Sequence, residues 1–147
     1  RDSLLDIISS TYWDVDAYLK DNGRDNISAL MIAGGWVEGL YMATQVCKTH
    51  DTPELRQRIA DQQYPLGELI ELMGTYSTDD PAVSGVKSDL DALAGLFAAL
   101  PTPAASTVTQ ENGVAVIGGG AAPAAITDDQ LKAITEKTAT IRNGYIN

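Results

Sequence analysis

Hydrophobic residues recur at helical spacing along most of this chain, and that periodicity constrains its fold more than any other feature. Five segments place apolar side chains three or four positions apart, the pattern of a helix with one buried face. They lie at about residues 2–19, 26–48, 53–73, 81–100 and 128–143. Most connections between them are short, as between antiparallel neighbours. The sequence therefore predicts a mainly α fold, an antiparallel bundle of four to five helices.

Local signals mark where these helices begin. Thr52 followed by Pro53, and Asp80 followed by Pro81, each pair an N-cap residue with proline at the first helical position. The sequence TDDQ, which begins at Thr127, predicts a capping box in front of the last helix. Three of the five predicted helices thus have a defined start.

Glycine and proline mark the ends and one interruption. Gly23 and Gly144 suit the position just after the first and last helices, where a left-handed backbone is common. Pro65 lies inside the third segment and is expected to kink that helix or split it in two. The sequence LPTP at residues 100–103 ends the fourth helix.

The second segment is apolar around more than half of its circumference, so we expect it to be the central helix. It contains Gly34, Gly35 and Gly39, although glycine costs about 1 kcal/mol relative to alanine in a helix interior. We interpret these glycines as points of close approach by another helix, with Trp36 filling the space beside them. The alternative is a crevice that admits a ligand.

The first segment carries an apolar stripe, and both of the first two segments carry aromatic residues. The stripe consists of Leu4, Ile8, Tyr12, Val15 and Leu19. The aromatic residues are Tyr12, Trp13, Tyr18, Trp36 and Tyr41. We expect the stripe in the core and the aromatic rings to pack across an antiparallel helix pair; the alternative is a ligand pocket with Glu38 or Asp16 at its mouth. The candidate binding residues of this region are Trp13, Trp36, Tyr41, Gly35 and Gly39.

One β-hairpin is predicted before the last helix. In STVTQENGVAVIG, two β-prone runs flank Asn112 and Gly113, the dipeptide typical of a type I′ turn. This turn pairs Glu111 with Val114. The sequence GGGAAPAA then leads to the last helix, so hairpin and linker occupy about residues 104–125. The exposed strand edge is a candidate contact surface for another chain, with Asn112 and Gly113 as interaction candidates.

The three glycines that follow the second strand resemble a dinucleotide-binding fingerprint, but the rest of that motif is missing. Pro123 occupies the third small-residue position, and the next helix begins only after Thr127. No second strand with an acidic residue about 20 positions on follows. We therefore predict no cofactor.

Charge and residue content narrow the possible functions. The chain has 20 acidic and 10 basic residues, a net charge of −10, which disfavours nucleic acids and anionic membranes as partners. Cys47 is the only cysteine and His50 the only histidine. We expect Cys47 to be a buried structural thiol, and we predict no metal site and no catalytic residues.

Three stretches support a resemblance. GGWVEGLYMATQ (Gly34–Gln45), YWDVDAYL and the C-terminal ITDDQLKAITEKTATIRNGYI resemble helical bacterial cell-envelope proteins of unknown function, which are secreted or lipoprotein-type. The resemblance implies an exported chain, periplasmic or at the cell surface, cut from a longer precursor. Membrane contact would then come only through a lipid anchor lost from this chain.

These observations predict a single domain over residues 1–147 that acts as a non-enzymatic binding or interaction module. Its partner would be another protein or a second copy of the chain, bound through the hairpin edge. The second candidate function is a small-ligand sensor or carrier that uses the glycine- and aromatic-lined crevice of the second helix.

Overall fold

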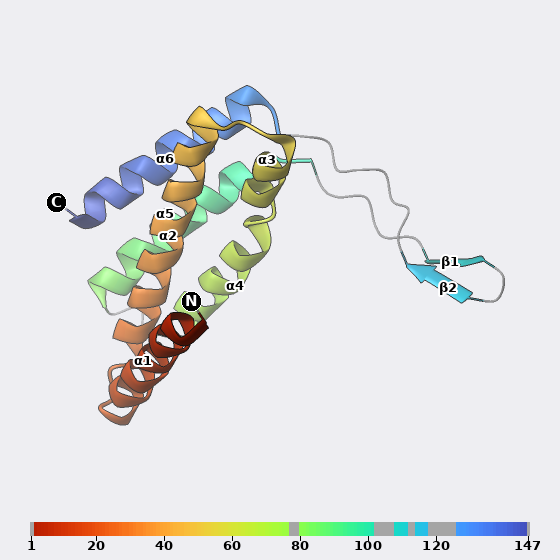
Figure 1. The fold of residues 1–147 in the computed structure, drawn as a ribbon. Coiled ribbons are helices and arrows are strands. Elements are labelled where there is room, and N and C mark those ends of the chain that lie inside the picture. The colour runs from red at the N-terminus through yellow and green to blue at the C-terminus, as the bar shows by residue number, and fades with distance from the viewer. Residues whose placement is uncertain (1, 77–79, 102–107, 112–113, 118–125, 147) are drawn as a thin grey trace.

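The computed structural model describes residues 2–76, 80–101, 108–111, 114–117 and 126–146. These residues form six α-helices and two short strands, in the order α1 (Asp2–Asp21), α2 (Asp25–Thr49), α3 (Pro53–Ala60), α4 (Gln63–Gly74), α5 (Pro81–Phe97), β1 (Val108–Glu111), β2 (Val114–Ile117) and α6 (Asp128–Ile146). The helices pack into one bundle (Figure 1). The prediction of a mainly α bundle is confirmed.

α2 is the central helix, as its apolar circumference predicts. It packs against α1, α3, α4, α5 and α6. Its buried face joins the core with apolar side chains from α3 to α6. The fully buried core residues include Ala33, Val37, Ile59, Leu66, Met73, Leu90, Leu93, Phe97 and Ile134. By length and composition α2 is the one helix in the described residues that could cross a membrane; the central helix of a packed bundle meets the same criteria, so this gives no localisation.

The predicted helix starts are confirmed. Thr52 Oγ1 accepts the backbone N–H of Leu55 at 3.2 Å, and the carboxylate of Asp80 accepts two backbone N–H groups in the first turn of α5. In front of α6, Thr127 Oγ1 accepts the N–H of Gln130 at 3.2 Å, and Gln130 Oε1 accepts the N–H of Thr127 at 3.0 Å. Each bond satisfies a donor that the helix itself leaves free.

Gly23 ends α1 as predicted. Its φ of +65° is left-handed. The N–H of Arg24 reaches the carbonyl of Leu19 at 2.8 Å, and the N–H of Gly23 reaches that of Lys20 at 3.0 Å. These two bonds form a Schellman motif, which reverses the chain into α2.

The prediction for Gly144 is wrong, because α6 continues to Ile146. Tyr145, in this last turn, is 38% exposed, and its phenol hydrogen bonds to Asp89 of α5. Burial, reinforced by the charge of Asp89, raises the pKa of Tyr145. This contact with α5 accompanies the extension of the helix past its glycine.

The third predicted segment divides into α3 and α4, but ahead of the proline. The break falls at Asp61 and Gln62, and Pro65 lies in the first turn of α4. A proline there removes no intrahelical hydrogen bond, because the first N–H groups of a helix have no partner within it. The break at Asp61 and Gln62 therefore places Pro65 in a first turn, where a proline does not disrupt the helix.

The C-terminal end of α5 and the N-terminal end of α6 lie side by side. Leu100 and Ile126 are both buried in the core, and Gln130 Nε2 donates to the carbonyl of Ala99 at 2.9 Å. The end of α5 and the start of α6 are therefore neighbours in the bundle.

The glycines of α2 do not mark close approach by another helix. A Cβ atom built at Gly34, Gly35 or Gly39 meets no heavy atom of the described residues within 4 Å, apart from its two chain neighbours and the backbone of its own helix. Gly35 and Gly39 are exposed, since the packed face of α2 lies on the other side of the helix. The close-approach interpretation is therefore wrong.

The strands β1 and β2 pair antiparallel, with Val108 opposite Ile117 and Glu111 opposite Val114. This is the pairing that the Asn-Gly turn predicts. The turn itself, residues 112–113, and the linkers that join the strands to the bundle lie outside the described residues. The hairpin as a complete unit stays a prediction.

Candidate functional site

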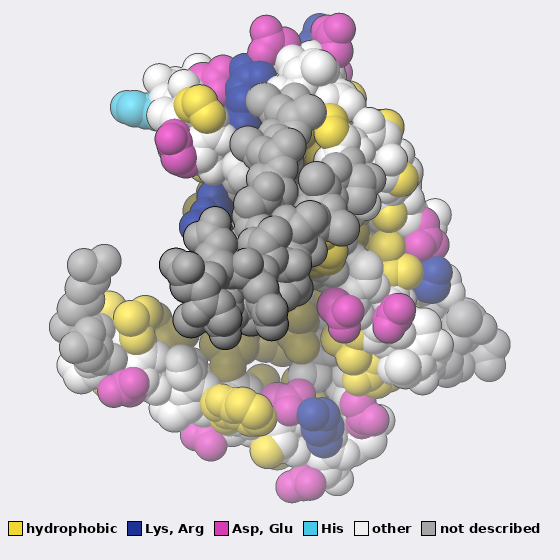
Figure 2. All heavy atoms as spheres, turned by 90° about the vertical axis from the view of Figure 1, so that its right-hand side faces the viewer, with side chains coloured by type: hydrophobic (Ala, Val, Ile, Leu, Met, Phe, Trp, Pro, Cys, Tyr) yellow, Lys and Arg dark blue, Asp and Glu magenta, His cyan; other side chains and the backbone are white. Residues whose placement is uncertain are grey.

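Most apolar side chains of α1 lie on the surface, not in the core. Seven large ones are between 45% and 74% exposed: Leu4, Leu5, Ile7, Ile8, Tyr12, Trp13 and Tyr18. Of the stripe predicted to be buried, only Leu19 is buried, and Val15 is half-buried. The reason is that, among the described helices, α1 packs mainly against α2, which leaves most of its apolar side chains exposed. α1 is the lowest element in Figure 1, and Figure 2 shows hydrophobic side chains along this lower part of the molecule.

The C-terminal half of α1 is fixed to the start of α2. Asp16 Oδ1 accepts the hydroxyl of Ser28 at 2.5 Å, and Asp16 Oδ2 accepts Lys20 Nζ at 2.7 Å. Hydrogen bonds from Lys20 and then Ser28 hold the pKa of Asp16 below its ordinary value. Leu19 is buried beside this junction. The first half of α1 therefore extends from a junction with α2 that these contacts hold in place.

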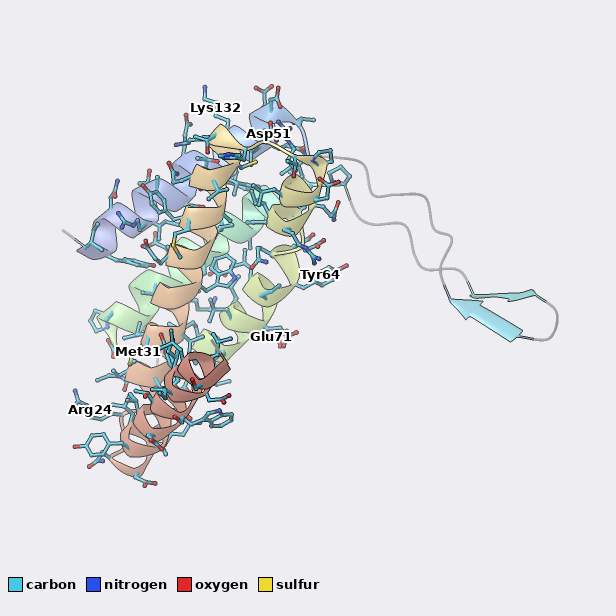
Figure 3. The ribbon with its side chains drawn as sticks, viewed as in Figure 1. Arg24, Met31, Asp51, Tyr64, Glu71 and Lys132 are labelled. Carbon is cyan, nitrogen blue, oxygen red and sulfur yellow. The ribbon has the colours of Figure 1, made fainter. Side chains whose placement is uncertain are left out.

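α2 carries an exposed stripe that begins at the same junction. Ser28, Gly35 and Met42 lie seven positions apart and so share a face. The exposed members of this face, which we call the α2 stripe, are Met31, Ile32, Gly35, Gly39, Met42 and Val46. Met31 lies close to α1 in Figure 3. Two neighbouring helices therefore each leave an apolar face uncovered.

A cavity of about 380 Å³ lies between α1 and α2. Its lining includes Tyr12, Trp13, Asp16, Ser28 and Met31. The volume falls within the range of small-molecule sites, about 300–1,000 Å³. The sequence offered an aromatic pocket as an alternative. Of the residues predicted for it, Tyr12, Trp13 and Asp16 line this cavity together.

Trp36 lies elsewhere, so the predicted meeting of the aromatic rings across α1 and α2 is wrong. Its Nε1 donates to Gln62 Oε1 at 3.2 Å. Trp36 and Gly39 line a smaller cavity of about 220 Å³ that also contacts Arg58 and Gln62. That volume is below the usual range for ligand sites.

Tyr41 belongs to a third group. The guanidinium of Arg142 lies 4.5 Å from the centroid of its ring, and Arg142 Nε donates to Glu38 Oε2 at 2.7 Å. The hydrogen bond to Glu38 raises the pKa of Arg142, so the cation over the ring stays charged. Tyr41 and Glu38 thus join α2 to α6 instead of lining a pocket with Trp13.

A cavity of about 490 Å³ lies between the end of α2 and the start of α6, a site that the sequence did not indicate. Its lining residues are Thr44, Cys47, Lys48, Asp51, Arg56, Asp128, Leu131, Lys132, Thr135 and Glu136. Asp51 and Lys132 mark this end of the bundle in Figure 3. No local motif reveals the site because its walls are about 80 positions apart in the chain.

Arg56 organises one wall of this cavity. Its guanidinium donates to Asp51 Oδ1 at 2.6 Å, to Asp128 Oδ1 at 2.6 Å and to the carbonyl of Ile126 at 3.0 Å. The hydrogen bonds to Asp51 and Asp128 raise the pKa of Arg56, and Arg56 in turn lowers the pKa of Asp51. The guanidinium of Arg56 is therefore occupied by hydrogen bonds to Asp51, Asp128 and Ile126 of the same chain.

Cys47 is buried, as predicted for a structural thiol, and its Sγ lies 3.6 Å from Asp51 Oδ1. Burial, followed by the charge of Asp51, raises the pKa of the thiol, which keeps it protonated and weakly nucleophilic. His50 is the C-cap of α2. Among the described residues, no three or more His, Cys, Asp or Glu side chains are grouped to hold a metal ion.

No protein-family model, curated protein or solved structure matches this chain.

Proposed function

We propose that this chain is a non-enzymatic interaction module that binds a protein through the exposed apolar face of α1. The observation that carries the proposal is the set of seven exposed large apolar side chains on one 20-residue helix. Leu4, Leu5, Ile8 and Tyr12 share one face of the helix, and a cluster of exposed apolar side chains marks an interaction site in folded proteins. A helix face with apolar residues at positions i, i+3, i+4 and i+7 is a common recognition element for another helix.

The charge of α1 favours a protein over a membrane as its target. Between Asp2 and Asp21 the helix has five aspartates and a single basic residue, Lys20. Helices that lie on membranes usually carry lysine and arginine beside the apolar face, because the cytoplasmic leaflet and bacterial lipids are anionic. An acidic helix is repelled by such a surface. Protein contact is therefore the interaction that the surface supports.

We further propose the setting that the sequence resemblance implies, a bacterial cell envelope reached by export, with any membrane attachment through a lipid anchor. The strand edge of the predicted hairpin is a second contact surface under this proposal. Mass spectrometry of fractionated producing cells tests the setting. The fraction that contains the protein gives its compartment, and the mass of its N-terminal peptide reveals any lipid.

A photo-cross-linking residue placed in the producing cells tests the function. Replacing Tyr12, on the α1 face, by p-benzoylphenylalanine should give discrete protein adducts on illumination. The matched control replaces Tyr64, which is similarly exposed and points away from α4 on another side of the bundle (Figure 3). Adducts at Tyr12 and few at Tyr64 support the proposal; absence of protein adducts at Tyr12 contradicts it.

The second candidate function is small-ligand binding, and the cavity between α2 and α6 favours it. Its volume of about 490 Å³ suits a metabolite-sized ligand, and both cations and carboxylates line it. A thermal-shift screen of polar metabolites tests this function. A hit that is lost on Leu131→Trp, which fills the cavity, would support ligand binding there, whereas a hit that survives would place the ligand elsewhere.

A further inference from the structure

We propose that the cavity between α2 and α6 binds a small zwitterion with an apolar side chain, an amino acid or a short peptide. This inference rests on the second candidate function, ligand binding in that cavity, and names the class of ligand. Three features of the described lining residues carry it: a floor without free polar groups, a lysine outside any ion pair, and a surplus of negative charge around Arg56.

The buried part of the lining, which we call the cavity floor, consists of Thr44, Cys47 and Thr135, with Leu131 partly buried. The hydroxyls of Thr44 and Thr135 each donate to a carbonyl of their own helix at 2.7 Å. Burial raises the pKa of the Cys47 thiol, which stays neutral. These polar atoms are already satisfied, so the part of a ligand that lies on the floor is expected to be apolar.

Lys48 supplies a positive charge at the cavity. Its Nζ donates to the neutral side-chain oxygen of Gln45 at 2.9 Å. Among the described residues, Lys48 forms no ion pair with a carboxylate. An ammonium group has several hydrogens to donate, so Lys48 can hold a ligand carboxylate and keep its contact with Gln45.

Another part of the lining has a surplus of negative charge. Asp51 and Asp128 both accept hydrogen bonds from the single guanidinium of Arg56, so two negative charges face one positive charge. Lys132 and Glu136 do not alter this balance, because Nζ and Oε1 lie 4.0 Å apart and the two charges offset each other. The side chain of Asp128 is 88% exposed and that of Asp51 45%. Asp128 is therefore the more accessible partner for a ligand ammonium group.

The lining as a whole favours a ligand without net charge. Six charged side chains take part, three of each sign: Lys48, Arg56, Lys132, Asp51, Asp128 and Glu136. A ligand with one charge is attracted by half of them and repelled by the other half, whereas a zwitterion can place each charge against its opposite. The net charge of −10 on the chain adds a repulsion for anions that a zwitterion does not feel. The volume of about 490 Å³ leaves room for an aromatic side chain.

Phenylalanine and its two truncated forms test the recognition of both charges. Phenylpropanoate lacks the ammonium group, and phenethylamine lacks the carboxylate. Titrations followed by NMR should show phenylalanine binding about two- to fivefold more tightly than either form, because each lost charge pair lies near the surface. Alanine should bind about tenfold more weakly than phenylalanine, because it has no ring to cover the floor. Glycylphenylalanine, whose two charges lie further apart, distinguishes a short peptide from a free amino acid as the better ligand.

Substitutions of single charges assign each end of the ligand. Lys48→Gln should weaken phenylalanine and phenylpropanoate about two- to fivefold and leave phenethylamine unchanged. Asp128→Asn should weaken phenylalanine and phenethylamine and leave phenylpropanoate unchanged. The matched control is Lys137→Gln, the same change of charge on α6 outside the cavity lining, which should alter none of the three. Both Lys48 and Asp128 are exposed, so each variant should fold like the parent.

The NMR signals also locate the ligand. Backbone amides around Cys47 and Leu131 should shift on titration, whereas the indole N–H of Trp13, in the cavity between α1 and α2, should not. Shifts confined to Trp13 and its surroundings would overturn the proposal.

Three further results would overturn it. The first is equal binding of phenylalanine and both truncated forms. The second is a Lys48→Gln variant that weakens phenethylamine as much as phenylalanine. The third is no binding of phenylalanine or glycylphenylalanine in the millimolar range. An uncharged metabolite whose binding is lost on Leu131→Trp, in place of any zwitterion, would overturn this ligand class and leave the second candidate function standing.

Discussion

Replacing Gly34 by alanine should stabilise the protein. Gly34 lies inside α2 on a side away from the α2 stripe, and a Cβ built there meets nothing within 4 Å. Alanine in a helix interior is favoured over glycine by about 0.8–1.0 kcal/mol, so the free energy of unfolding should rise by about 1 kcal/mol. For a chain of this size the melting temperature should rise by about 2–4 °C.

Urea unfolding followed by circular dichroism measures this change. The midpoint should rise by about 0.5 M with an unchanged slope, because the surface exposed on unfolding stays the same. The matched control is Gly23→Ala. With φ at +65°, alanine there adopts a left-handed backbone, which costs about 1–2 kcal/mol.

The two substitutions are chemically identical and should have opposite signs. A lower midpoint for Gly34→Ala would refute the reasoning, because it would mean that a neighbouring segment fills the space where the new methyl group lies. The close-approach interpretation of the α2 glycines would then be correct after all.

Three further predictions concern the core and the cavity. Phe97→Ala, at a fully buried position, should cost about 3–5 kcal/mol of unfolding free energy; a loss below about 1 kcal/mol in urea unfolding would contradict the packed core. Arg56→Gln should lower the unfolding midpoint at neutral pH. Because Arg56 lowers the folded-state pKa of Asp51, this contribution is fully present above the unfolded pKa of about 3.9 and fades as pH falls through the folded value. An Arg56→Gln deficit that persists unchanged in acid would disprove the link. Cys47 should resist a thiol reagent such as DTNB in the folded chain at pH 8 and react fully in urea; rapid native labelling would show that the thiol is not buried.

Features set by neighbouring residues were predictable from the sequence. A helix cap depends on side chains within about three positions, so the residue order alone identifies Thr52, Asp80 and Thr127 as caps. The same holds for Gly23, whose backbone angle follows from its place after a helix. Periodicity also identified α2 as central, because only a helix surrounded by others can be apolar on most of its surface.

Features set by distant contacts were not predictable. The spacing of Leu4, Ile8 and Tyr12 shows that α1 has an apolar face, but spacing carries no information about what covers it. Arg56 and Asp128 are 72 positions apart, and their ion pair leaves no local signal. The cavity between α2 and α6 escaped prediction for the same reason.

Contacts within the bundle hold the end of α5 next to the start of α6. Arg56 and Gln130 hold the two ends in place through the backbone carbonyls of Ile126 and Ala99. Loop-closure entropy grows by only about 0.6 kcal/mol for each doubling of length, so the connection can be long or short at little cost in stability. We therefore expect that a segment of another length could replace this connection while the helical bundle keeps its fold.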